Sequence, residues 1–462
     1  MASGIDLLII VIYLLVILAV SIKLSLKETL DGFFVNNRKT RTVFLVFSIV
    51  STTFGAGALI GLAGAAYSTG ISFGISNLVT VILGFTLLAL IAPKIKRFGD
   101  KFGAHTIGDF FAVRFSHRAR LLVSALTIIA FFIFTGAQFV AIGSLASVLV
   151  GINFTTALFG AALIAIAYTA LAGLKGDIYT DFIQFLVMII AFFAALIPFG
   201  ILKFGLPTSL PPTHLDPFNF AGPIFFFGSI FLGGLYLLAS MDWWQRIYAS
   251  KDPKQARKIF SWAVILAIPL YAMAIALGLM AASSLGPGLD PDSVLFVIME
   301  QSLPVGLLGL GYAGILAAVM STVDSMIVVS TASALKDFYK TTINPRAIDS
   351  QTLKHARTFA IIFGLAGLGV AYLLPDIVNL VLLSIFIIAT FIPATLIGMF
   401  WKGTTEKAAF WSILIGVIVL MIFAPIAFTL SWLPSFFAAL ISLIVISKFT
   451  RHSKTEKLSK LN

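Results

Sequence analysis

Long apolar runs constrain this chain more than any other feature, since several windows of more than 18 residues carry almost no charge. About 20 apolar residues in a helix cross the hydrocarbon core of a bilayer, and in lipid the backbone must satisfy its own hydrogen bonds. Of the 462 residues, 60% are hydrophobic and only 11% are charged, which is outside the averages of soluble proteins. The sequence therefore predicts an all-α polytopic membrane protein whose surroundings are a lipid bilayer.

We predict thirteen transmembrane helices. They lie near residues 7–26, 42–66, 73–93, 121–149, 154–171, 179–202, 222–240, 258–284, 304–334, 356–374, 377–400, 408–429 and 431–448. No connection between them is long enough for a soluble domain, so the chemistry must lie within the helix bundle. The moderately apolar residues 103–117 predict a further helix at the membrane interface.

The basic residues are distributed unevenly over the connections. The net charge is +12, yet of the 31 Lys and Arg residues only Lys203 lies outside one alternating set of connections. The positive-inside rule assigns that set to the cytoplasm, which places the N-terminus outside and the C-terminus inside the cell. Basic residues scattered over short loops do not form a nucleic-acid surface. The sequence predicts a multi-pass protein of the plasma membrane with no nucleic-acid partner.

Two of the spans contain glycine-rich segments that weaken a helix. Residues 51–70 read STTFGAGALIGLAGAAYSTG, and the span near 222–240 carries Gly228, Gly233 and Gly234. Such segments either let helices pack closely or let freed carbonyls face a cavity. The two spans are five apart, as expected for the first helix of each half of a five-plus-five inverted repeat. This spacing favours two broken helices around a binding site.

Residues 317–340, AAVMSTVDSMIVVSTASALKDFYK, place a carboxylate and several hydroxyls in an apolar helix. A charged residue at mid-membrane costs at least ~2.5–3.5 kcal/mol, so it usually pairs with something or faces a polar path. Hard cations such as Na+ prefer oxygen ligands, whereas a single Ser in such a helix more often bonds its own backbone. The residues that share about a third of the helix circumference are Ala318, Ser321, Thr322 and Ser325, with Asp324 at the edge. Their clustering indicates an ion site.

Two further polar residues lie in apolar surroundings. Asp181 follows Thr180 in GLKGDIYTDFIQ (173–184), where it either caps a helix or meets the hydroxyl stripe as a cation ligand. Gln138 in FTGAQFVAIG either bonds a neighbouring helix or contacts a substrate. The sequence leaves both alternatives open for each residue.

Other kinds of site are weak or absent. The chain has no Cys, its five His residues lack metal-ligand spacing, and neither a P-loop nor a nucleophile with a paired base is recognisable. Trp243 and Trp244, followed by Arg246, are typical of an aromatic belt at the membrane surface. An enzyme is therefore not expected. The classes that remain are gradient-driven transport, passive conduction through a channel, and a membrane sensor.

The segments of this chain resemble the sodium:solute symporter family. The resemblance covers nearly the whole sequence and is carried by GFFVNNR (32–38), TIGDFFAVRFSHRARLL (106–122), GLKGDIYTDFIQ (173–184) and residues 317–340. It implies a leucine-transporter-like fold, in which two inverted five-helix repeats have one preceding and two trailing helices. The implied division is 1–41 for the first helix and a cytoplasmic loop, 42–204 for the first repeat, 205–221 for an external loop, 222–400 for the second repeat, 401–449 for the trailing helices and 450–462 for a cytoplasmic tail.

The resemblance also implies where ions bind. The family's sodium site combines carbonyls of the first broken helix with a carbonyl and two hydroxyls of the eighth core helix, which here are Ser51, Phe54, Ala318, Ser321 and Thr322. Some members bind a second sodium ion at positions that correspond to Asp181, Ser321, Asp324 and Ser325. Asp324 replaces a hydroxyl of that pattern, which leaves three roles open for it: binding a second Na+, taking a proton, or ordering the network.

The implied substrate pocket lies between the broken helices and the third core helix. Its residues are Thr53, Gly55, Phe73, Asn77, Gln138 and Tyr236. None of them is positively charged, so a substrate carboxylate would rely on backbone amides or on bound Na+. We therefore expect Na+-coupled symport of a small organic solute by alternating access: an amino acid such as proline, a monocarboxylate or a sugar-like compound. Proton coupling through Asp324 and Asp181 is the alternative.

Overall fold

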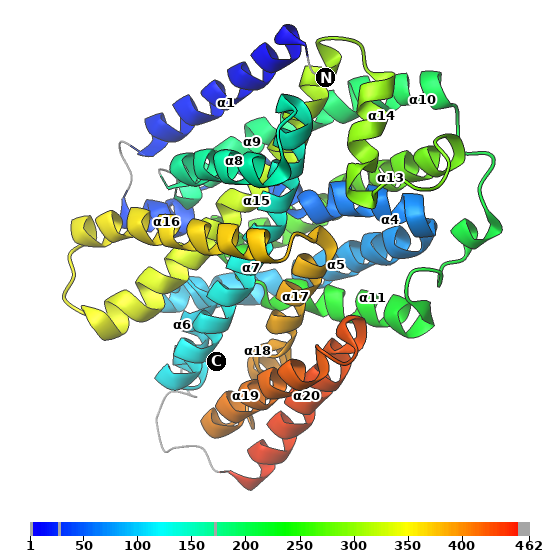
Figure 1. The fold of residues 1–462 in the computed structure, drawn as a ribbon. Helices are drawn as coiled ribbons and strands as arrows, with labels where there is room; N and C mark the ends of the chain where they lie inside the picture. The colour runs from blue at the N-terminus through cyan, green and yellow to red at the C-terminus, as the bar shows by residue number, and fades with distance from the viewer. Residues whose placement is uncertain (1–2, 26–28, 171–172, 451–462) are drawn as a thin grey trace.

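The computed structural model describes residues 3–25, 29–170 and 173–450, and these residues form helices joined by short connections, without a strand (Figure 1). The main helices of the first half are α1 (Gly4–Ser25), α2 (Leu30–Val35), α3 (Thr42–Thr53), η2 (Gly57–Gly61), α4 (Leu62–Thr69), α5 (Ile71–Phe102), α6 (Ile107–Arg114), α7 (His117–Val150), α8 (Phe154–Thr169), α9 (Leu174–Ile189), η3 (Ile190–Leu196) and α10 (Ile197–Phe204). Those of the second half are α11 (Gly222–Ala239), α12 (Met241–Ala249), α13 (Pro253–Ser284), α14 (Val294–Ser302), α15 (Leu307–Ser333), η6 (Ala334–Ile343), α16 (Asp349–Leu373), α17 (Ile377–Ala389), α18 (Ile392–Phe400), α19 (Glu406–Phe423) and α20 (Trp432–Phe449). The all-α prediction is confirmed.

The observed helices follow the predicted spans closely. In the described part of the chain, eleven helices are long and apolar enough to cross a bilayer, and a twelfth span is the pair formed by α3 with η2 and α4, which is bent by 60°. The remaining predicted span, 154–171, corresponds to α8, which has 16 residues and is shorter than the others. The predicted interfacial segment 103–117 contains α6. The predicted tail beyond Thr450 and the predicted span ends at 26 and 171 lie outside the described residues.

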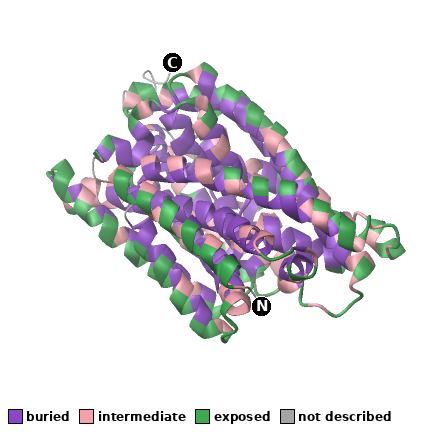
Figure 2. Cartoon of the chain, turned by 90° about the horizontal axis from the view of Figure 1, so that it is seen from above, coloured by how far each residue is buried: buried purple, intermediate pink, exposed green. Residues whose placement is uncertain are grey.

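Helix α15 forms the centre of the bundle (Figure 1). Its residues 311–333 are buried without exception, and it packs against α3, α7, α9 and α16. Outer helices instead keep one apolar face exposed (Figure 2), and Leu8 and Leu15 of α1 are 57% and 58% exposed. Exposed apolar side chains on helices of this length are typical of a surface that lipid covers. The oxygen-rich segment therefore lies in the helix most remote from lipid.

Both glycine-rich spans are interrupted. Helix α3 ends at Thr53, and the chain resumes at Gly57 as one turn of π-helix before α4. Helix α11 ends at Ala239, and Ser240 is extended (φ −75°, ψ 124°) before α12 begins. An interruption frees carbonyls and amides from the helical ladder, so each break offers main-chain polar groups inside the bundle.

The second half of the second broken helix turns into the bundle. Trp243 and Trp244 are 3% and 0% exposed, and Arg246 is also 0% exposed. The indole N–H of Trp244 donates to the Leu238 carbonyl across the break (2.8 Å). The prediction of an aromatic belt at the membrane surface is therefore wrong, because the change of direction at Ser240 carries these side chains into the protein interior.

Candidate functional site

The break after α3 brings carbonyls of that helix against two hydroxyls of α15. Ser321 Oγ lies 3.1 Å from the Ser51 carbonyl oxygen and 2.8 Å from that of Ala318. Thr322 Oγ1 lies 3.0 Å from the Thr52 carbonyl oxygen and 3.3 Å from that of Ala318. Both hydroxyl residues are completely buried. The structure thus brings together the two helices at the residues that the motif named.

The chemistry of this oxygen group fits a sodium ion. Its atoms are neutral oxygens, and carbonyls of unwound backbone coordinate Na+ in membrane proteins of this kind. Phe54, the remaining member of the predicted set, has φ −98° and ψ 48°, so it lies outside the helical conformation. The C-terminal end of α3 contributes the partial negative charge of a helix terminus. These residues would hold Na+ without a carboxylate, and the Thr52 carbonyl is a neighbour that the motif did not name.

Gly55 and Gln138 both contribute to the structure at the interruption after α3. The backbone N–H of Ala56 donates to Gln138 Oε1 (2.8 Å), which satisfies an amide that the interruption frees. A Cβ atom added at Gly55 would lie 2.4 Å from Thr322 Oγ1 and 2.8 Å from Gln138 Oε1, so a side chain here would push into the oxygen group. Gly55 is therefore required for the close approach of α3 to α15. Gln138 joins two helices, which is the first of the two alternatives that the sequence left open.

The guanidinium of Arg246 lies at the position predicted for a second cation. It approaches Asp181 Oδ2 at 3.1 Å and Asp177 Oδ2 at 3.2 Å, and it donates to Ser325 Oγ and Thr52 Oγ1, both at 2.7 Å. All five side chains are at most 3% exposed. A buried charge is tolerated only with partners, and here one cation bridges two carboxylates. Asp181 therefore contacts a protein cation rather than capping α9.

Asp177 and Arg246 were not among the predicted site residues. Asp177 lies four residues before Asp181, so both carboxylates share one face of α9, and this spacing in an apolar helix was the available signal. Arg246 follows the broken span directly, and the sequence groups it with the tryptophans of the predicted aromatic belt. Its role depends on the direction of the chain after Ser240, which local sequence does not reveal.

Asp324 lies apart from this ion-pair network. Thr169, at the end of α8, donates its hydroxyl to Asp324 Oδ1. Asp324 Oδ2 is buried and has no hydrogen-bond partner among the described residues. Of the four residues predicted for a second cation, Asp181 and Ser325 thus meet at Arg246, Ser321 belongs to the first oxygen group, and Asp324 contacts another helix.

A small cavity adjoins the two breaks. It has a volume of about 110 Å³, which is below the range of about 300–1,000 Å³ for drug-sized ligands. Five of the six predicted substrate residues line it, namely Thr53, Gly55, Phe73, Asn77 and Tyr236, and Gln138 does not. The lining also includes Asp242, Trp243 and Tyr271, and it contains no Lys, Arg or His. The cavity therefore suits a small solute without a strong negative charge.

Comparisons with known sequences agree with the resemblance. The profile of the sodium:solute symporter family matches residues 33–210 and 216–416. Sodium/proline symporter 2 of Staphylococcus saprophyticus is 28% identical over 91% of this chain and 88% of its own length. The osmoregulated proline transporter OpuE of Bacillus subtilis is 27% identical over 85% of this chain and 84% of its own length.

Comparisons with solved structures concern the fold. A Na+-coupled sialic acid symporter in a substrate-bound outward-open state is 20% identical, covers 98% of this chain and 99% of its own, and gives a TM-score of 0.83. A nucleobase-cation-symport-1 family transporter in a closed conformation is 14% identical, covers 93% of this chain and 97% of its own, and gives a TM-score of 0.58. The predicted leucine-transporter-like architecture is confirmed. With the family profile matching most of its length, the chain belongs to the sodium:solute symporter family.

Proposed function

We propose that this protein takes up a small organic solute by Na+-coupled symport, with alternating access of its site to the two sides of the plasma membrane. The observation that carries the proposal is the contact of the Ser321 and Thr322 hydroxyls with the carbonyls of the broken helix α3. We include the orientation that the basic residues predict, with the N-terminus outside and the C-terminus in the cytoplasm. Membership of a transporter family supports transport rather than catalysis.

The break after α3 would couple the ion to the solute. It supplies carbonyls to the sodium set, and it also supplies Thr53 and Gly55 to the cavity wall. A bound cation therefore fixes the wall that the solute contacts. A solute that orders this wall strengthens sodium binding in return, because coupling between two sites is reciprocal.

The cavity favours a zwitterionic solute that carries a protonated amine. Asp242 lines it, and Ser240 donates to Asp242 Oδ1, whereas Oδ2 has no hydrogen-bond partner among the described residues. A buried carboxylate oxygen without a partner is costly, and a bound ammonium would relieve that cost. Phe73 and Tyr271 offer apolar surface for a compact carbon skeleton. The sodium/proline symporters among the relatives support an amino acid such as proline over a sugar-like compound or a monocarboxylate.

We propose one sodium ion per transport cycle. A second Na+ near Asp181 and Ser325 would meet the positive charge of Arg246, whose guanidinium lies 3.1 Å from the carboxylate and 2.7 Å from the hydroxyl. The position is thus already taken by a cation of the protein itself. A Hill coefficient near one for the Na+ dependence of uptake is the corresponding observation.

Replacing Na+ with choline tests the proposed coupling. In proteoliposomes we expect proline uptake under an inward Na+ gradient to fall at least about tenfold when choline replaces Na+, within the usual range of coupling between sites. Uptake that is the same in choline would contradict sodium coupling. A thermal-shift screen of amino acids, sugars and carboxylates, with and without Na+, would identify the solute independently, because a bound solute stabilises the folded state.

Proton coupling remains the second candidate function because of Asp324. Its Oδ2 lacks a partner among the described residues, and a lasting charge in a membrane helix is costly, so the group is suited to exchange a proton. If protons drive transport, uptake follows a pH gradient in the absence of Na+ and is abolished in Asp324→Asn. We expect instead that Asp324→Asn keeps Na+-driven uptake within about threefold, since the residue contacts Thr169 and not the sodium set.

A further inference from the structure

The external loop 205–221, which joins α10 to α11, lies on the turn between α4 and α5. Asn219 Nδ2 donates to the Thr69 carbonyl at the end of α4 (3.0 Å). A Cβ atom added at Gly70, whose φ is +78°, would lie 2.1 Å from the His214 carbonyl oxygen. The loop is therefore in close contact with the backbone at the end of the first broken helix.

Ser72 fixes the loop at the first turn of α5. Its hydroxyl donates to the Pro217 carbonyl (2.8 Å) and accepts the backbone N–H of Phe220 (3.2 Å). Ser72 is 3% exposed, so both bonds are shielded from water. A hydroxyl that uses its donor and an acceptor site toward one loop defines where that loop lies. Phe220 is thereby held beside the start of α5.

The ring of Phe220 packs on a residue of the solute cavity. Its centre lies 4.6 Å from that of Phe73 and 5.3 Å from that of Phe225 on α11. Phe73 lines the cavity of about 110 Å³, whereas Phe220 does not belong to its lining. Aromatic rings at this separation attract each other beyond their apolar contact. Phe220 therefore supports the cavity wall from outside and joins α5 to α11.

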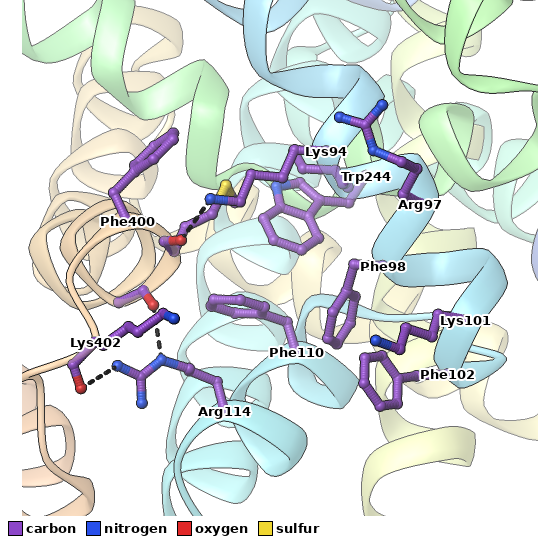
Figure 3. Close-up of a pocket in the computed structure, with 13 residues that line it drawn as sticks. Lys94, Arg97, Phe98, Lys101, Phe102, Phe110, Arg114, Trp244, Phe400 and Lys402 are labelled. Atoms are coloured by element: carbon purple, nitrogen blue, oxygen red, sulfur yellow. Dashed lines mark hydrogen bonds between the residues drawn. The ribbon is translucent and has the colours of Figure 1, made fainter. Parts of the chain in front are cut away.

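The two ends of α5 are held by different parts of the chain. At the cytoplasmic end, Lys94 Nζ donates to the Met399 carbonyl at the end of α18 (2.8 Å), within a cavity of about 440 Å³ (Figure 3). At the outer end, the bonds of the loop to Ser72 add to the packing of α5 against α11 and α13. The position of Phe73 consequently depends on a connection as well as on the membrane helices.

We propose that Phe220 is a positioning residue for solute binding, which acts through Phe73 to keep the outer wall of the cavity in place. The external loop then takes part in solute recognition although it does not line the site. The inference deepens the proposed function, since it takes the cavity as the place where the transported solute binds.

Solute kinetics test this role. In proteoliposomes, Phe220→Ala should raise KM for proline at least about threefold, because the ring pair with Phe73 is lost. The maximal rate should change by less than about twofold, since a positioning residue acts on binding. Phe220→Tyr keeps the ring and should behave like the wild type. If Phe220→Ala does not fold, Phe220→Leu also removes the ring and should raise KM in the same way.

Thiol labelling tests the cavity wall without transport. The chain contains no Cys, so Asn77→Cys places a single thiol in the cavity lining one helical turn after Phe73. In right-side-out membrane vesicles, without Na+ and without solute, an external membrane-impermeant maleimide should label this thiol at least about threefold faster when Phe220→Ala is added. Without the ring of Phe220, Phe73 is free to turn away from the cavity mouth.

Phe218 provides the matched control. It lies in the same loop, but its ring packs on Phe226 and Phe227, neither of which lines the cavity. Phe218→Ala should therefore keep the wild-type KM and labelling rate. Equal changes in this control, or no change of either quantity in Phe220→Ala, would overturn the proposal. Absence of Na+-coupled uptake in the wild type would contradict the proposed function instead, whereas the labelling comparison would still decide the role of Phe220.

Discussion

The double substitution Ser321→Ala/Thr322→Ala is expected to weaken sodium binding at least about a hundredfold and to abolish Na+-driven uptake at moderate Na+ concentration. In the proposed sodium site each hydroxyl would be a ligand to a buried cation, and an interaction of this kind is worth about 1.5–3 kcal/mol. The carbonyls of Ser51 and Ala318 would remain, but two oxygens would be missing from the set. The measurement is the Na+ dependence of solute-induced current in proteoliposomes, together with the rise of Tm on adding Na+.

A second serine of α15 provides the matched control. Ser330 is buried two turns further along the helix, and its hydroxyl donates to the Met326 carbonyl of its own helix (2.9 Å). Ser330→Ala therefore removes the same atom without touching the proposed sodium set, and its Na+ dependence should match that of the wild type. Thr322→Ser keeps the oxygen and should retain most of the affinity. If the double variant keeps the Na+ response of the Ser330→Ala protein, these hydroxyls do not bind sodium.

Most of the fold could be predicted from the sequence, because the apolar spans and the glycine-rich segments depend on properties of neighbouring residues in the chain. A span in lipid must be apolar and helical over its whole length, so each span was visible in its own residues. The glycine-rich segments at 51–70 and 222–240 marked both interruptions because unwinding is also a local property. The oxygen group was also predictable from local sequence, since Ser321 and Thr322 are consecutive residues on the same side of one helix.

The ion-pair network was not predictable in this way. Arg246 contacts residues of α3, α9 and α15, which lie between 65 and 198 positions away along the chain. Its neighbours Trp243 and Trp244 suggest a membrane surface, and only the turn at Ser240 directs them inward. The contact of Gln138 could not be predicted from the sequence either. Its partner, the backbone N–H of Ala56, is identified by the geometry of the break and not by any motif.

Replacing Arg246 with glutamine is expected to lower the free energy of unfolding by about 3–5 kcal/mol and to abolish transport. The substitution leaves Asp177 and Asp181 buried beside each other without a cation, which is the costly way to break a buried ion pair. It also removes the contacts to Ser48 and Thr52 through which α12 holds the first half of the broken helix α3. Thermal unfolding in detergent and uptake in proteoliposomes measure the two effects. Arg257→Gln, which removes an exposed arginine on α13, should change neither.

A double-mutant cycle separates the ion pair from simple loss of packing. Asp177→Asn combined with Arg246→Gln removes one negative and one positive charge, so it should be more stable than Arg246→Gln alone by at least about 1 kcal/mol. If the two substitutions are additive, the carboxylate and the guanidinium are not coupled and the network is only a packing contact. Strong coupling would show that the chain balances its own buried carboxylates with Arg246. Position 246 would then be the place where one residue decides between a protein cation and a second transported ion.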